Sequence, residues 1–302
     1  MKNAIMYYYN LIPENMRLTS KYTKFNVDNN NFVLELVQRN PDEINDIYQL
    51  SNYLLQINVP CHQIIPNVNN QIITLINNQP YILLKVVINS DQIISENDIL
   101  FFSNLIIDKR NYKTLHRNNW GQLWASKIDY LEYQVSQFGK KYSIIRDSFS
   151  YHIGLAENAL QLYKNISTDN LLCVAHKRIK KDCTMYDLYN PLEFIIDTRV
   201  RDFCEYCKQR FFYNNTDNNL AKSYIYNNNL TEEEIKLFFC RMLFPTVYFD
   251  LYEDIVIDGE NERELIPIIT EANNYENLLK ELYTMIEQYI RIDIIEWLKI
   301  SS

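Results

Sequence analysis

Short apolar runs typical of β-strands dominate the first part of the 302-residue chain. One helix interrupts them, because Pro, Asp and Glu at positions 41–43 suit the first turn of a helix that extends to about residue 56. Residues 1–18 are also predicted to be helical, with Pro13 as a break or first-turn residue. Asn-rich turns separate the predicted strands, which cover residues 22–27, 32–37, 62–66, 71–76 and 81–87.

After Ser95 the apolar residues recur at spacings of three and four, which predicts helices. Two short strand-like runs, 171–174 and 194–196, enclose a polar loop. Thr231 followed by Glu234 has the spacing of a capping box at a helix start. The predicted helices cover residues 98–107, 121–138, 143–163, 201–211, 219–227, 231–243, 246–252 and 274–298.

This order of elements predicts an α+β chain with a small β-rich N-terminal lobe over residues 1–90 and a helical C-terminal lobe over residues 91–302. A β-rich lobe followed by a helical lobe with two short strands is the layout of the bilobal protein-kinase or aminoglycoside-phosphotransferase fold. The polar loop between the two short strands is the place where that fold carries its catalytic loop.

Net charge and hydropathy exclude several classes of protein. The formal net charge is −8 and the pI is near 5.2, which argues against a nucleic-acid-binding module. A basic cluster at Lys177, Arg178, Lys180 and Lys181 is interpreted as a solvated loop. No run of about 20 apolar residues is present, and the first 11 residues lack the apolar core of a signal peptide. We therefore expect a soluble protein without a membrane partner, made in the cytoplasm.

The six cysteines do not have the spacing of a secreted disulfide scaffold. Cys204 and Cys207 form a CxxC pair, but a structural zinc site needs a second pair or nearby histidines. The pair falls in a predicted helix, so we interpret it as two thiols near a helix face. We expect no metal centre there and no bound cofactor.

Three stretches carry a resemblance to a known family. They are residues 120–132, which begin Trp-Gly-Gln-Leu-Trp, residues 147–159, which include Tyr-His-Ile-Gly-Leu-Ala-Glu-Asn, and residues 176–206. Together they resemble the spore coat proteins of the YutH type, in the CotS-like group, over nearly the whole chain. That family is related to aminoglycoside phosphotransferases and occurs in bacteria that form endospores. The resemblance implies synthesis in the mother cell, a place in the spore coat, and other coat proteins as partners.

The parts that would bind a nucleotide are missing from the sequence. A phosphate-covering loop needs close backbone approach, for which glycine is the usual residue, but the first glycine of the chain is Gly121. The predicted hairpin at residues 27–32 offers Asn and Asp, and Asp28 repels phosphate. Glu35 stands where the nucleotide-binding lysine is expected, and no lysine lies between Lys24 and Lys85.

The catalytic loop is also degenerate. Its usual pattern is His, any residue, then Asp, whereas this chain has His176, Lys177 and Arg178. Arginine stays charged and does not accept the proton of a substrate hydroxyl. Cys183 replaces the metal-binding asparagine, and the adjacent Asp182 is a weak substitute for it. Only Asp197 keeps a functional position, that of the metal-binding aspartate, and one carboxylate is a poor site for a magnesium–nucleotide complex.

These residues are therefore predicted to be structural, with no catalytic residue among them and Asp197 as a vestigial metal ligand. His176 is expected to hydrogen-bond to backbone near the loop. Asp197 is expected to pair with one of three arginines, at positions 178, 199 and 201. Asp202 and Glu205 are expected to support the following helix. Glu35, Asp197, Arg201 and Asp202 are the predicted structural motif.

Three functions remain open at this point. The first is a non-catalytic, pseudokinase-like structural or assembly component of the spore coat, which uses surface tyrosines and helices to contact other coat proteins. The second is a small-molecule or protein kinase with residual or atypical activity, since Asp197 is retained. The third is a ligand-binding module that uses the old cleft without chemistry. The loss of the catalytic set favours the first.

Overall fold

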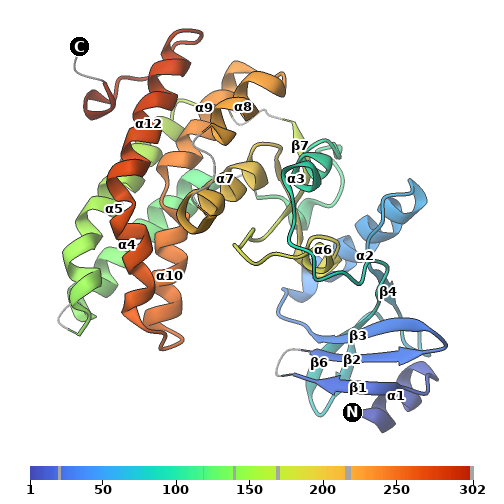
Figure 1. Cartoon of the computed structure of the whole chain (residues 1–302). Helices are drawn as coiled ribbons and strands as arrows, with labels where there is room; N and C mark the ends of the chain where they lie inside the picture. Colours follow the sequence, from blue (N-terminus) through green and yellow to red (C-terminus); the bar gives the residue numbers. More distant parts are fainter. Residues whose placement is uncertain (20–21, 118, 139–140, 168–170, 215–218, 300–302) are drawn as a thin grey trace. The chain divides into compact units, whose positions relative to one another are not determined.

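The computed structural model describes residues 1–19, 22–117, 119–138, 141–167, 171–214 and 219–299, and its chain forms two compact units (Figure 1). Unit 1 contains the whole of the predicted N-terminal lobe, and the predicted boundary at residue 90 lies inside its first segment. Unit 1 consists of Met1–Asp98, Ile107–His116 and Asp182–Ile196, and unit 2 of Ile99–Ile106, Arg117–Lys181 and Asp197–Ser302.

Unit 1 is built on an antiparallel sheet with the strand order β1-β2-β3-β6-β4, and β5 pairs with β6 beside this path. The sheet buries alternate residues such as Phe25, Leu34 and Leu83 against helix α1 (Lys2–Tyr9). The five runs predicted from the sequence correspond to β2–β6. The strands are β1 (Glu14–Leu18), β2 (Tyr22–Val27), β3 (Asn30–Leu36), β4 (Gln63–Ile65), β5 (Thr74–Ile76) and β6 (Gln79–Lys85).

Strand β1 corrects the prediction of a helix over residues 1–18. The helix ends at Tyr9, and Asn10 closes it in the left-handed conformation. The residues of β1 are exposed except for Met16, which is half-buried, so no alternation of polar and apolar positions marks the strand. β1 exists through backbone pairing with β2, including a register shift between Glu14 and Arg17. The local pattern of polar and apolar residues does not encode this pairing of backbones.

Helix α2 follows its sequence signals closely. In α2 the Asn40 side chain accepts a hydrogen bond from the Asp42 backbone N–H, and Pro41 occupies the first turn. The predicted helix over residues 41–56 is confirmed. Unit 1 contains α1 (Lys2–Tyr9), α2 (Pro41–Gln56), η1 (Lys113–Leu115), α6 (Met185–Leu188) and η2 (Pro191–Glu193).

Unit 2 is mostly helical. Helix α5 packs on α4 and α9, and α9 also packs on α7 and α12 (Figure 1). Two elements cross between the units along the chain, α3 (Glu96–Ser103) and β8 (Phe194–Thr198). The others are α4 (Trp120–Phe138), α5 (Ser143–Tyr163), β7 (Leu172–His176), α7 (Arg201–Asn214), α8 (Leu220–Asn227), α9 (Glu232–Leu243), α10 (Thr246–Val256), η3 (Glu262–Leu265), α11 (Ile266–Thr270), α12 (Ala272–Glu287) and η4 (Glu296–Leu298).

The C-terminal helix is shorter than predicted. The sequence pattern predicts one helix over residues 274–298, but α12 ends at Glu287. The following segment is largely irregular, yet it buries Ile292, Ile295 and Leu298. The Tyr283 hydroxyl anchors it, by donating to the Asp293 carbonyl at 3.2 Å and accepting from the Ile295 N–H at 3.4 Å. Apolar spacing alone does not distinguish such a packed segment from a helix.

The capping box at the start of α9 is confirmed. The Thr231 hydroxyl accepts from the Glu234 N–H, and the Glu234 carboxylate accepts from the Thr231 N–H. Replacing Thr231 by Ala is expected to lower the free energy of unfolding by about 1 kcal/mol, because one N–H of the first turn loses its partner. Urea unfolding measures this, with Thr231→Ser as the variant expected to keep wild-type stability. Equal stability of the Ala variant would contradict the role of the cap.

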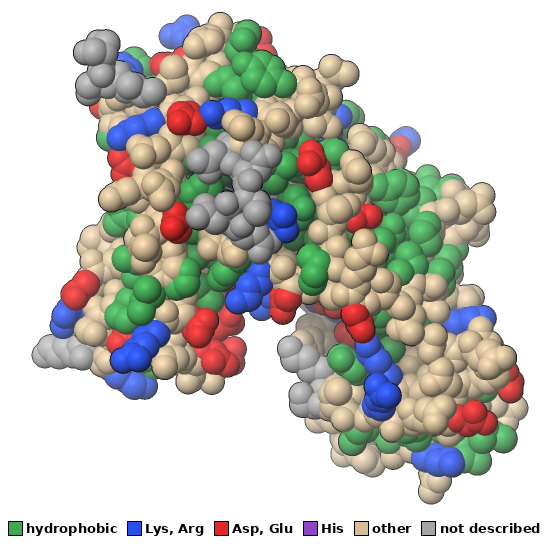
Figure 2. Space-filling view, viewed as in Figure 1, with side chains coloured by type: hydrophobic (Ala, Val, Ile, Leu, Met, Phe, Trp, Pro, Cys, Tyr) green, Lys and Arg blue, Asp and Glu red, His purple; other side chains and the backbone are tan. Residues whose placement is uncertain are grey.

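Within the described ranges, no helix combines the length and apolar composition that crossing a lipid bilayer needs. Charged side chains of both signs are interspersed on the face seen in Figure 2.

Candidate functional site

Asp197 is the centre of a buried polar network in unit 2. It is 1% exposed and lies near the end of β8. Its Oδ2 accepts from the Trp120 indole Nε1 at 2.8 Å and lies 3.1 Å from Arg201 Nε. Arg241 Nη2 lies 3.3 Å from both carboxylate oxygens, and the Thr198 N–H donates to Oδ1 at 2.7 Å. Both oxygens of the carboxylate are therefore engaged by donors of the chain itself.

Burial dominates the electrostatics of this network. It raises the pKa of the Asp197 carboxyl, while the charges of Arg241 and Arg201 act to lower it. Burial also lowers the pKa of the Arg201 guanidinium, while Asp197 and Asp202 act to raise it. Each charge is thus tolerable inside the protein only because its partners are present.

The network contains one of the three predicted partners of Asp197 and two residues that the sequence analysis missed. Arg201 pairs with Asp197, whereas Arg178 pairs with Asp250 and Arg199 with Glu234. Arg201 follows Asp197 by four residues, which is a visible signal. Arg241 and Trp120 lie 44 and 77 residues away along the chain. No motif marks either of them as a partner.

The described residues contain no group of three or more His, Cys, Asp or Glu side chains arranged to hold a metal ion. Magnesium prefers six oxygen ligands in an octahedron and binds carboxylates with free lone pairs. To reach a cation, Asp197 would have to release donors that are themselves buried. This arrangement suits an internal ion-pair network better than a metal site.

His176 ties the end of β7 to the start of α7. Its ring Nδ1 lies 2.6 Å from Asp202 Oδ2, and its backbone N–H donates to the same carboxylate at 3.0 Å. A carboxylate only accepts, so Nδ1 carries the proton. The Asp202 carboxylate is a partner of the ring that the sequence analysis did not name. Arg201 completes the junction by donating to the carbonyl oxygens of His176 and Lys177.

Arg178 occupies the position expected for the catalytic aspartate, and its guanidinium lies in unit 2. Its side chain is 39% exposed and pairs with Asp250 on α10, with a distance of 2.9 Å from Nε to Oδ2. Nη1 also donates to the Lys177 carbonyl at 3.3 Å. A permanently charged group held by an acid offers no base for a hydroxyl proton.

Glu35, at the position expected for the lysine, belongs to unit 1. It lies on β3 opposite Tyr22 and Ile82 in the strand register. Its Oε2 accepts from the Asn190 side-chain amide at 3.1 Å, and Asn190 is buried. Within unit 1 this contact joins the sheet to the turn before η2.

A cavity of about 210 Å³ lies beside the Asp197 network in unit 2. One part of its wall is aromatic, and the other part carries charged side chains of both signs. The aromatic residues are Trp120, Trp124, Phe244 and Phe249. The charged residues are Lys127, Arg178, Arg201, Glu205, Arg241 and Asp250.

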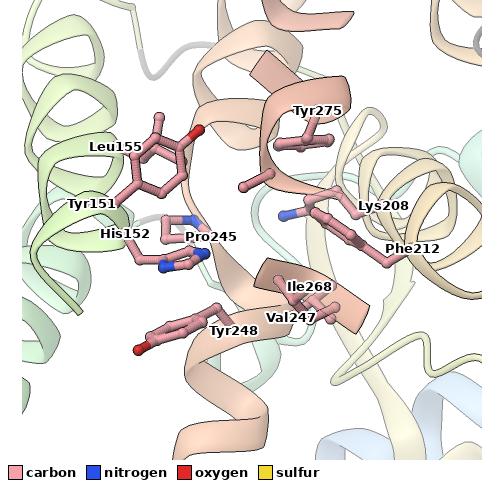
Figure 3. Close-up of a pocket in the computed structure, with 11 residues that line it drawn as sticks. Tyr151, His152, Leu155, Lys208, Phe212, Pro245, Val247, Tyr248, Ile268 and Tyr275 are labelled. Carbon is pink, nitrogen blue, oxygen red and sulfur yellow. The ribbon is translucent and has the colours of Figure 1, made fainter. Parts of the chain in front are cut away.

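A second, much smaller cavity in unit 2 has room for about one water molecule, at about 10 Å³ (Figure 3). His152 and Tyr248 stack in its wall with ring centroids 3.6 Å apart. The Lys208 ammonium lies in the same wall and contacts Glu205, Thr246 and the carbonyls of Arg241 and Phe244 at 2.7–3.2 Å. This cavity is too small for a ligand, and its polar groups fasten α7 to the turn between α9 and α10.

The six cysteines are buried, and no disulfide joins any two of them among the described residues. Cys204 and Cys207 lie on α7, as predicted for a pair of thiols on a helix. Burial raises the pKa of the Cys204 thiol to about 12, which makes it a poor nucleophile and a poor metal ligand at neutral pH.

Comparison with solved structures confirms the fold class. The chain superimposes on an aminoglycoside phosphotransferase from Alicyclobacillus acidocaldarius with a TM-score of 0.71 and 11% identity, covering 95% of this chain and 97% of that one. A spectinomycin phosphotransferase solved with ADP and spectinomycin gives a TM-score of 0.61 at 12% identity, with 95% and 97% coverage. At such identities the likeness shows the fold alone.

Comparison of sequences gives a narrower grouping. Residues 2–282 match the family described as "Spore coat putative kinase YutH". A curated relative, the endospore coat-associated protein YutH of Bacillus subtilis (strain 168), is 25% identical over 209 residues. The match covers 59% of this chain and 61% of that relative.

Proposed function

The chain belongs to the YutH family of spore coat proteins, and from this membership we propose that it is a non-catalytic, kinase-like component of the endospore coat. The observation that carries the proposal is the state of Asp197. Its carboxylate is 1% exposed and is engaged by Trp120, Thr198, Arg201 and Arg241. A phosphotransferase needs that carboxylate to hold the metal ion of the nucleotide.

Two further positions support the proposal. Arg178 stands at the place of the proton acceptor and is paired with Asp250. Glu35 stands at the place of the phosphate-binding lysine and is hydrogen-bonded to Asn190. A carboxylate at that place repels the phosphates that a lysine attracts. Three separate requirements of phosphoryl transfer are therefore unmet by the residues at the expected positions.

The proposed location follows the family. The Bacillus subtilis relative is described as associated with the endospore coat, so we place this chain in the coat after synthesis in the mother cell. Its proposed partners are other coat proteins. Exposed tyrosines suit such contacts because they bring a large apolar ring together with a hydroxyl. Tyr7, Tyr133, Tyr226 and Tyr289 are each more than half exposed.

A thermal-shift titration with ATP, with and without Mg²⁺, tests the proposal. We expect no magnesium-dependent rise in melting temperature, because the metal-binding carboxylate is occupied and the lysine is absent. A catalytically competent kinase of the same fold, assayed in parallel, is the control for the assay. A saturable, Mg²⁺-dependent rise, together with phosphate transfer that Asp197→Asn abolishes, would favour residual phosphotransferase activity instead.

A further inference from the structure

The cavity beside the Asp197 network has a wall that contains several aromatic side chains. Trp124 and Phe244 stack with centroids 4.4 Å apart and planes 10° from parallel. Phe249 packs edge-on against Phe244, with centroids 5.4 Å apart. Benzene occupies an engineered apolar cavity of about 150 Å³, so a volume of about 210 Å³ holds one six-membered ring and a small substituent.

Arg241 places a buried, incompletely partnered guanidinium in the same cavity. The residue is 2% exposed, and its guanidinium carbon lies 4.6 Å from the ring centroid of Trp120 and 5.8 Å from that of Trp124. Nη2 is engaged by Asp197, but Nε has no hydrogen-bond partner among the described residues. Nε itself is sealed from solvent, so what Arg241 offers to a ligand in the cavity is the positive charge of its guanidinium.

Arg178 contributes a second guanidinium to the cavity wall. Its Nε pairs with Asp250, and its Nη1 donates to the Lys177 carbonyl. The fork of a guanidinium carries five N–H bonds, so these contacts leave donors for a ligand. Two guanidiniums beside aromatic rings match the planar geometry of a carboxylate, which arginine binds through two parallel hydrogen bonds.

The acids in the wall limit how much negative charge a ligand can carry. Glu205 Oε1 lies 3.0 Å from Lys208 Nζ and accepts from Thr246, and Asp250 is paired with Arg178. These carboxylates already have cationic partners within the protein, so they do not require a cationic ligand to compensate their charge. They would nevertheless repel a doubly charged phosphate more than a singly charged carboxylate.

We propose that this cavity binds a small monocarboxylate with one aromatic ring. The carboxylate lies between Arg178 and Arg241, and the ring lies against Trp124, Phe244 and Phe249. This inference goes beyond the proposed coat function and does not depend on whether the chain transfers phosphate. It concerns unit 2 alone, since every residue of the cavity wall belongs to that unit.

Calorimetric titration of the full chain with benzoate tests the inference. We expect saturable binding with one site, and binding of benzamide, the neutral analogue, weaker by about tenfold or more. Arg178→Gln removes one guanidinium without touching Asp197 and is expected to weaken benzoate binding by about tenfold. Leu123→Trp enlarges a residue that lines the cavity and is 47% exposed, so it narrows the cavity and leaves both guanidiniums in place.

The matched control is Arg146→Gln, an arginine paired with Asp147 on the surface and outside the cavity. It is expected to bind benzoate as the wild type does. The benzoate affinity of each variant is compared with that of the wild type at an unchanged melting temperature. A loss of binding then does not reflect a loss of folded protein. Equal affinity for benzamide and benzoate, or no saturable binding at ~10 mM, overturns the site. Benzoate affinity unchanged in both Arg178→Gln and Leu123→Trp also overturns the site. Tighter binding of phenyl phosphate than of benzoate overturns the choice of a carboxylate ligand.

Discussion

Replacing Asp197 by Ala is expected to lower the free energy of unfolding of unit 2 by about 3–5 kcal/mol. The substitution leaves Arg201 and Arg241 buried beside each other without their shared carboxylate, and each is 2% exposed. It also removes the acceptor of the Trp120 indole N–H. Removing one partner of a buried ion pair costs far more than the pair contributes net, because the remaining charge stays desolvated.

The sign of this effect separates a structural aspartate from a catalytic one. Functional carboxylates in open sites are commonly held at some cost to stability, so their removal is often neutral or stabilising. All three tryptophans of the chain lie in unit 2, at positions 120, 124 and 297, so tryptophan fluorescence during urea unfolding reports on that unit. Asp197→Ala is read against Asp147→Ala, an exposed acid whose loss is expected to change stability by less than about 1 kcal/mol.

An Asp197→Ala variant as stable as the wild type would remove the main support for a structural role. In that case the buried guanidiniums would have to find other partners or water. The isosteric Asp197→Asn variant gives an intermediate test, because it keeps the shape and loses the charge. We expect it to fall between wild type and Asp197→Ala.

Lys208→Met is expected to destabilise unit 2 by a similar amount, about 3–5 kcal/mol. Lys208 lines the small cavity (Figure 3). The residue is 1% exposed, and its ammonium contacts Glu205, Thr246 and two backbone carbonyls. Methionine fills much of the same volume, so the loss is mainly electrostatic. Glu205 then remains buried without its cation, and the two carbonyls lose a donor.

The matched control for this variant is Lys222→Met. Lys222 pairs with Glu281 on the surface of unit 2, and its removal is expected to change the free energy of unfolding by less than about 1 kcal/mol. An equal decrease in the free energy of unfolding in the two lysine variants would show that burial does not increase the contribution of Lys208 to stability.

The sequence predicted local features better than long-range ones. The start of α2 at Pro41 and the Thr231 capping box depend on residues within one turn, and both are present in the structure. The pairing of Asp197 with Arg201 was one of the three alternatives, and the structure shows it. Helix caps follow from backbone geometry within one turn, which the sequence carries directly.

Contacts between distant segments were beyond the sequence pattern. Arg241 reads as an ordinary basic residue in the last turn of α9, and Trp120 as the first residue of α4. Only the packing of the helices in unit 2 brings both to Asp197. Strand β1 was missed for a related reason, since its pairing with β2 is a backbone property that exposed side chains do not encode.

The cavity also had no signature in the sequence. Its wall is drawn from α4, the loop after β7, α7, α9 and α10, so no segment shows more than a few of its residues. The sequence analysis gave Arg178 as a replaced catalytic aspartate, as part of a basic loop and as a possible partner of Asp197, but not as part of a cavity wall. In the folded chain Arg178 lines the same cavity as Trp124 and Arg241, and this role is visible only in the structure.

The most direct test asks whether Asp197 binds a metal ion in the presence of nucleotide. Mn²⁺ replaces Mg²⁺ in such sites and gives an electron paramagnetic resonance signal that weakens when the ion binds protein. With a non-hydrolysable ATP analogue present, we expect the free Mn²⁺ signal to be the same with and without the protein, because the Asp197 carboxylate is engaged by Arg201, Arg241 and Trp120. A stoichiometric loss of the signal that Asp197→Asn reverses would contradict a non-catalytic role.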